Sequence, residues 1–197
     1  MGADTDDDKP LRLEERFSGL CRALNETGAY EIHRKFRIRK EDIVQQIGAI
    51  HPDLLHFVGH GNSSGALLLH TDGCGVETLL PDHMKGVLEF CAPWLKVLFL
   101  GACHSLHHAQ TAAESIDAVI GMKAEIAADA ELEFAKTLYL SLASGASLKD
   151  SVECARSQLK LVSPRFAEVP VLCLKNGVLA EDIKLMPKGL KKIRRMK

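Results

Sequence analysis

The chain has 197 residues, of which 46% are hydrophobic and 26% charged, and its formal net charge is −1. This length and hydrophobic content fit one folded domain with a substantial core and exclude a disordered chain. The near-zero net charge gives no general attraction to nucleic acid, and no apolar run approaches the roughly 20 residues that span a bilayer.

The first part of the chain predicts an acidic tail, two helices and a strand. Residues 1–10 read MGADTDDDKP, which is polar and not a secretory signal, so we expect a mobile tail there. Apolar residues recur at helical spacing over 11–26 and again over 40–49. Between these helices, residues 30–38 alternate apolar and basic side chains, which predicts a strand with one solvated face.

Two short apolar runs in the middle of the chain each end in small residues and one reactive side chain. They read LLHFVGHG over 54–61 and VLFLGACHS over 97–105, and runs of this kind predict buried parallel strands. His60 and Cys103 then follow the carboxyl ends of their strands, at the sheet edge where ligands bind in α/β proteins. If the strands are neighbours, His60 and Cys103 face each other across a crevice.

The remaining segments alternate helices with short strands. A hairpin is predicted from 66 with a turn at 72–75, and helices over 82–90, 106–115, 129–143 and from 148 onward, the last capped by Ser147. Strands are predicted at 118–121 and 170–174. We therefore expect an α/β fold with a mostly parallel sheet flanked by helices on both faces.

Cys103 and His60 form a nucleophile and a base suited to acyl transfer. A thiolate is the reactive form of cysteine, and an imidazole can take its proton and return it to a leaving amine. The backbone amides of Gly61 and Cys103 are candidates for an oxyanion hole. Taken alone, Cys103 would be read as a buried structural cysteine, but its placement relative to His60 favours catalysis.

The blocks HFVGHG, GACHS and AVIGM, followed by the helix DAELEFAKTLYLSLASGASLKDSVECAR, resemble the CHAT domain in order and spacing. The resemblance covers roughly residues 11–174. It implies a caspase-like fold, with His60 and Cys103 matching the dyad of a cysteine endopeptidase that cleaves proteins or peptides without a cofactor. It also implies control by an activating partner or by self-association.

The same resemblance directs attention to substrate-binding residues. In relatives, an acidic residue near the start of the helix at 129 helps form the pocket for the residue before the cut bond. Ala128 occupies the usually acidic position, and Asp129 could substitute only if the loop shifts. His104, beside the nucleophile, is a further substrate-binding candidate.

Other histidines have less specific interpretations. Cys103, His104, His107 and His108 show metal-like spacing, but no second Cys/His pair lies nearby, so no metal site is predicted. We expect His107 and His108 to be solvated or to shape the mouth of the cleft. His56, inside its strand, is expected to be a packed or hydrogen-bonded core histidine.

CHAT domains usually begin with an apolar strand, which the polar segment 1–10 cannot supply. The sheet edge would then lack a strand or take one from another segment or chain. This leaves a second hypothesis open, in which the protein is a catalytically silent caspase-like scaffold used for assembly.

Composition also bounds the compartment and the partners. Six cysteines without a CxxC pattern indicate reduced thiols in a cytoplasmic protein. We expect the domain to span 11–180 and a basic tail to span 181–197. This tail is solvated or docks a partner; nucleic acid is not favoured because the tail has no aromatics to stack on bases, and no membrane association is expected.

Overall fold

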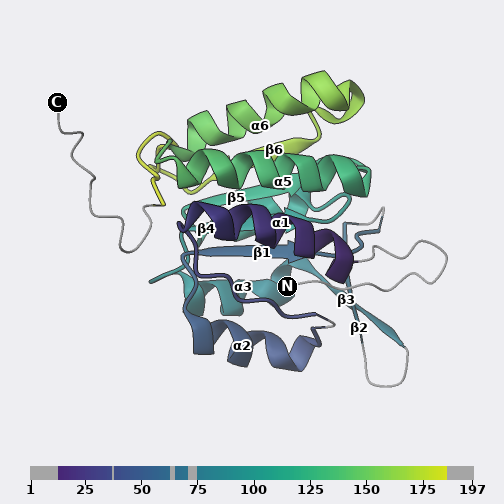
Figure 1. The fold of residues 1–197 in the computed structure, drawn as a ribbon. Coiled ribbons are helices and arrows are strands. Elements are labelled where there is room, and N and C mark those ends of the chain that lie inside the picture. The colour runs from purple at the N-terminus through teal and green to yellow at the C-terminus, as the bar shows by residue number, and fades with distance from the viewer. Residues whose placement is uncertain (1–12, 37, 63–64, 71–74, 186–197) are drawn as a thin grey trace.

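The computed structural model describes residues 13–36, 38–62, 65–70 and 75–185, which form a mostly parallel sheet with helices around it (Figure 1). Within these residues the sheet has four strands in the order β1-β4-β5-β6. β1, β4 and β5 are parallel, and β6 is antiparallel to β5. The predicted α/β class is confirmed. The strands are β1 (Leu54–Val58), β4 (Val97–Gly101), β5 (Ala118–Met122) and β6 (Pro170–Leu174).

Strand β4 is apolar throughout because both of its faces are covered. Every residue from Val97 to Gly101 is buried, as is typical of parallel strands between two helical layers. Successive side chains alternate, so Leu98 and Leu100 enter one core cluster while Val97 and Phe99 enter the other. The central strand therefore joins two cores on opposite faces of one sheet.

Each core is closed by its own set of helices. Apolar residues of α2, α3 and α4 pack into the first cluster, and those of α1, α5 and α6 into the second. Figure 1 shows α5 and α6 on the opposite side of the sheet from α2. The helices are α1 (Leu13–Thr27), α2 (Ile43–Ile50), α3 (Pro81–Cys91), α4 (Leu106–Ala112), α5 (Ala128–Ala143) and α6 (Leu148–Val162).

Local signals in the sequence determine where several helices begin and end. Gly145, at φ +89°, follows α5 and adopts a backbone conformation that disfavours other residues. The Ser147 hydroxyl then accepts a hydrogen bond from the Asp150 backbone N–H at 3.1 Å, which confirms the predicted N-cap of α6.

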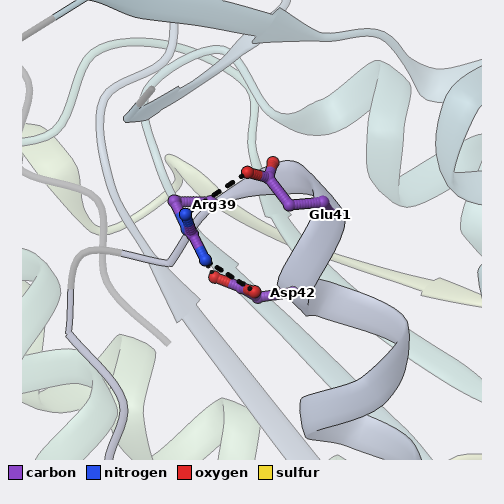
Figure 2. Close-up of polar contacts among 3 residues, drawn as sticks. All are labelled: Arg39, Glu41 and Asp42. Carbon is purple, nitrogen blue, oxygen red and sulfur yellow. Dashed lines mark hydrogen bonds and ion pairs between the residues drawn. The ribbon is translucent and has the colours of Figure 1, made fainter. Parts of the chain in front are cut away.

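The entry to α2 is held by a cluster of three charged residues (Figure 2). Arg39 donates from Nε to Asp42 Oδ2 at 2.7 Å and from Nη2 to Oδ1 at 3.1 Å. Its Nη1 lies 3.6 Å from Glu41 Oε1. The hydrogen bonds from Arg39 hold the pKa of Asp42 below its usual value. This fork fixes the 3-10 turn η1 (Lys40–Asp42) that leads into α2.

The strand predicted over 30–38 is wrong for the described residues of that segment. Residues 29–35 belong to no helix or strand, and Phe36 forms only an isolated bridge. The described residues of the segment add no strand to the sheet, and a cavity of about 700 Å³ is lined both by residues 28–36 and by Leu54, Leu55 and His56 of β1. The other predicted helices and strands are present, including the antiparallel hairpin of β2 (Leu67–His70) and β3 (Val76–Leu79). The turn predicted at 72–75 lies outside the described residues except for its last position.

Both predicted tails lie largely outside the described residues, which begin at 13 and end at 185. Ile183 and Leu185 still pack against the second core cluster, and the Leu148 N–H donates to the Ile183 carbonyl at 2.9 Å. Among the helices of the described ranges, none combines the length and the apolar character needed to cross a bilayer.

Candidate active site

His60 and Cys103 occupy equivalent positions after two neighbouring strands. β1 and β4 pair in parallel, with Val58 opposite Gly101. His60 lies two residues beyond Val58, and Cys103 lies two residues beyond Gly101. Both residues are half-buried. Because parallel strands end at the same edge of the sheet, the fold brings the two reactive residues to one edge, as the sequence predicted.

At this edge the backbone of Gly61 lies directly against Cys103. A Cβ atom at position 61 would overlap the Cys103 carbonyl group and would lie 3.5 Å from the Cys103 backbone nitrogen. Only glycine therefore permits this approach. The two amides predicted as oxyanion donors, those of Gly61 and Cys103, consequently belong to adjacent stretches of backbone.

The hairpin holds the His60–Gly61 segment in place. The Leu68 N–H donates to the His60 carbonyl at 3.0 Å, and the Asn62 N–H donates to the Ala66 carbonyl at 3.1 Å. Gly61 lies between these bonds, bridged to Leu67 in antiparallel fashion. In such a pair the central residue directs its own N–H and C=O away from the partner strand. The Gly61 N–H therefore points away from β2.

A buried serine anchors the turn that carries Cys103. Ser105 donates its hydroxyl proton to the Leu100 carbonyl at 3.0 Å and accepts the Met122 N–H at 2.9 Å. These bonds tie the turn to the ends of β4 and β5. His104, between Cys103 and Ser105, has a φ of 56°, a left-handed backbone conformation that is uncommon for histidine. The chain thus turns sharply after the cysteine, and α4 begins only at Leu106.

The thiol of Cys103 points to the segment that precedes α5. Its Sγ lies 3.8 Å from the Ile126 carbonyl oxygen, in the geometry of a weak S–H hydrogen bond. Ala128 opens α5 two residues later, and Asp129 is exposed in the first turn. The predicted substrate-binding residues Ala128, Asp129 and His104 therefore come from the two segments that meet at the thiol.

Beneath the site lies a buried polar pair that the sequence did not reveal as a pair. His56 Nε2 is 3.0 Å from Glu131 Oε1, and the two side chains are only 9% and 6% exposed. A Cβ on Gly101 would lie 2.7 Å from Glu131 Oε1, so this glycine makes room for the pair. The His56 ring stacks on Phe99 at 4.2 Å. His56 is thus a hydrogen-bonded core histidine, as expected.

Burial governs the protonation of this polar cluster. Desolvation lowers the pKa of His56, although the hydrogen bond to Glu131 acts in the opposite direction. Burial also raises the pKa of Tyr139 well above its usual value, and the charge of Glu131 adds to this effect. Among the described residues the Tyr139 hydroxyl has no hydrogen-bond partner. The helical periodicity of α5 could have predicted the burial of Glu131, because Glu131 lies three residues before Phe134 on the buried face of this helix.

The histidines that follow Cys103 have different environments. His107 is exposed, as expected, but the prediction of a solvated His108 is wrong, because that residue is only 2% exposed. Position 108 lies on the inward face of α4 next to buried Ala109. Within the part of the chain that the structure describes, no three His, Cys, Asp or Glu side chains are arranged to hold a metal ion.

A scan against protein-family models and a search of curated proteins find no match to this chain. Its function is therefore inferred from the fold and from the chemistry of the residues at this sheet edge.

Proposed function

We propose that the protein is a cysteine endopeptidase of the caspase-like, CHAT-type class, with Cys103 as nucleophile and His60 as general base and acid. One observation carries the proposal. His60 and Cys103 follow neighbouring parallel strands at equivalent positions, and the intervening Gly61 backbone lies against Cys103. A cysteine, a histidine and two backbone amides at one sheet edge are the groups that peptide hydrolysis needs.

The reaction uses these groups in two stages. His60 takes the proton of the Cys103 thiol, and the thiolate attacks the peptide carbonyl carbon, so that a C–S bond forms and the carbonyl oxygen becomes an anion. The Gly61 and Cys103 amides stabilise this oxyanion. His60 then protonates the leaving amine as the C–N bond breaks. Water, deprotonated by His60, releases the acyl group and restores the thiol.

The segments around the thiol contribute the substrate contacts. His104 follows the nucleophile directly. Ala128 and Asp129 begin α5, and the Ile126 carbonyl just before this helix accepts the weak hydrogen bond from the Cys103 thiol. Asp129 is exposed, and Ala128 stands where relatives carry an acidic residue. The pocket for the residue before the cut bond therefore favours basic side chains less strongly than an acidic pocket would.

The test is the alkylation rate of Cys103 as a function of pH, read by peptide mass spectrometry. Cys154 is exposed and serves as an internal reference in the same molecule. An assembled dyad makes half-buried Cys103 react about tenfold or more faster than Cys154 at pH 6.5, where an ordinary thiol is mostly protonated. In His60→Ala this advantage disappears, whereas the rate of Cys154 is unchanged.

Hydrolysis is then tested on a proteome-derived peptide library, with new amino termini identified by mass spectrometry. The wild-type protein should generate cleavages that are absent with Cys103→Ala and with His60→Ala. A Cys103 rate that is no faster than that of Cys154 and insensitive to His60, together with no cleavage, would contradict the peptidase.

One observation favours the second candidate, a catalytically silent scaffold. Within the described residues, β1 ends the sheet without a strand on its outer side, and an incomplete sheet suits an assembly module. The scaffold predicts that Cys103→Ala retains full function in cells, whereas the peptidase predicts loss of function.

A further inference from the structure

The outer side of β1 forms one wall of the cavity described above. In the described part of the chain β1 pairs with β4 only, so it is a terminal strand of the sheet. The cavity of about 700 Å³ runs along Leu54 and Leu55. A strand edge that borders a cavity presents backbone donors and acceptors to whatever enters it.

The register shows which groups face the cavity side. The Asp53 carbonyl accepts the Val97 N–H, and Leu54 lies opposite Val97 in the parallel ladder. In such a ladder alternate residues bond to the same neighbour, so Leu55 and Phe57 bond to β4. Leu54 and Val58 therefore direct their N–H and C=O groups away from β4, toward the side where a further strand could pair.

The walls of the cavity have the form of a slot for one extended chain. Leu20 and Leu24 of α1 line one side, and Ile47 and Ile50 of α2 line another. The extended segment 29–36 runs opposite β1 (Figure 1). Residues 29–35 of this segment have the alternation of a strand but lie in no strand, which is expected if the chain that belongs between them and β1 is supplied from elsewhere.

Charge distinguishes the kind of chain that fits. Among the described residues of the lining, the charged ones are four cations, Arg34, Lys35, Lys96 and Lys184, and two carboxylates, Glu31 and Asp53. All six are exposed. The apolar middle and the cationic rim thus favour a segment with apolar residues at its centre and carboxylates at its ends.

We propose that this groove binds an extended, acid-flanked apolar segment of a partner polypeptide, which adds to β1 as a further strand. Strand addition provides affinity through main-chain hydrogen bonds and specificity through alternate side chains. Because α1, α2 and segment 29–36 line the same cavity as β1, a strand that adds to β1 has to enter this cavity. The inference is independent of the proposed peptidase activity.

The test uses the full-length protein and a library of synthetic seven-residue peptides. The central five positions alternate between Thr and one of Val, Ile, Leu or Phe, and the ends are both Glu or both Lys in equal numbers. Glu-flanked members should bind, as measured by fluorescence anisotropy. A bound peptide should slow amide hydrogen exchange at Leu54 and Val58, as measured by NMR. A peptide with proline at its centre should not bind, because proline removes a backbone donor.

Charge reversal provides the matched variants. Arg34→Glu with Lys35→Glu changes two exposed rim residues and should weaken binding of Glu-flanked peptides by about tenfold. Lys160→Glu with Arg165→Glu changes two exposed residues near the end of α6 and should leave binding unchanged. The proposal is overturned if no member binds, if both flanks bind equally, or if binding leaves the β1 amides unprotected. Protection of these amides by dimerisation alone would assign the edge to a second copy and also overturn it.

Discussion

At the scale of single residues, Gly61 makes the sharpest stability prediction, because a side chain there has no space. Gly61→Ala would place a Cβ against the Cys103 carbonyl, which is backbone and cannot rotate away. We expect a loss of about 1–3 kcal/mol of unfolding free energy, as for other overpacking substitutions. Cys103 alkylation should slow as well, since the two segments must separate. Urea denaturation and the alkylation assay measure the two effects.

Gly86 provides the matched control for this substitution. It is exposed on α3, and a Cβ there meets nothing within 4 Å. Gly86→Ala should therefore stabilise the protein by about 0.5–1 kcal/mol, because alanine favours the helix and reduces the entropy of the unfolded chain. Equal effects of the two substitutions would contradict the close approach of Gly61 to Cys103.

His108 predicts how stability depends on pH. Burial lowers its pKa to about 4, helped by the nearby charge of His107, while the carbonyls of Leu79 and Gly65 act in the opposite direction. These two carbonyls do not reach hydrogen-bond geometry, so within the described residues neither ring nitrogen has a hydrogen-bond partner, and burial outweighs them. Between the unfolded pKa of about 6.5 and the folded value, the unfolded chain binds the proton and the folded chain does not, so stability falls as pH falls.

The size of this effect can be isolated by mutation. From pH 7.5 to 5.0, His108 should remove about 2 kcal/mol of unfolding free energy. His108→Leu removes the titrating group, so the loss on acidification should shrink by that amount, while the lowered pKa of His56 maintains the remaining slope in the same direction. Urea titrations at the two pH values measure this. An identical loss in both proteins would rule out His108 as the source.

At the scale of elements, most helices and strands could be predicted because their signals are local. The apolar runs of β1 and β4, the helical periodicity of α5 and the cap at Ser147 all act over a few residues. The segment 30–38 fails because alternation predicts an extended chain but not its partner. A strand requires hydrogen bonds from a neighbour, and the described residues of this segment line a cavity instead.

The same distinction applies to the candidate site. The positions of His60 and Cys103 at one edge followed from two short motifs, because parallel strands end together. The His56–Glu131 pair joins residues 75 apart in sequence, and Ser105 bonds to Met122 of another strand. Nothing local specifies such pairings. The burial of His108 was also missed, because the face of α4 that turns inward depends on how the helix packs.

At the scale of the whole molecule, one sheet couples the two cores. Leu98 and Phe99 are consecutive, fully buried residues of β4 that belong to opposite clusters. Loss of packing on one face therefore disturbs the strand on which the other face depends. This coupling favours a single cooperative unfolding transition over separate melting of the two helical layers.

The chain provides a spectroscopic test of this cooperativity. Trp94 is the only tryptophan and packs against the first cluster, so its fluorescence reports that face, whereas far-UV circular dichroism reports all helices. We expect both signals to give the same urea midpoint. Leu98→Ala should cost about 2–5 kcal/mol and Phe99→Ala about 3–5 kcal/mol. Each substitution should shift both signals together, although only Leu98 lies on the side of Trp94. If Phe99→Ala moved the dichroism midpoint while Trp94 fluorescence kept its own, the two layers would unfold independently.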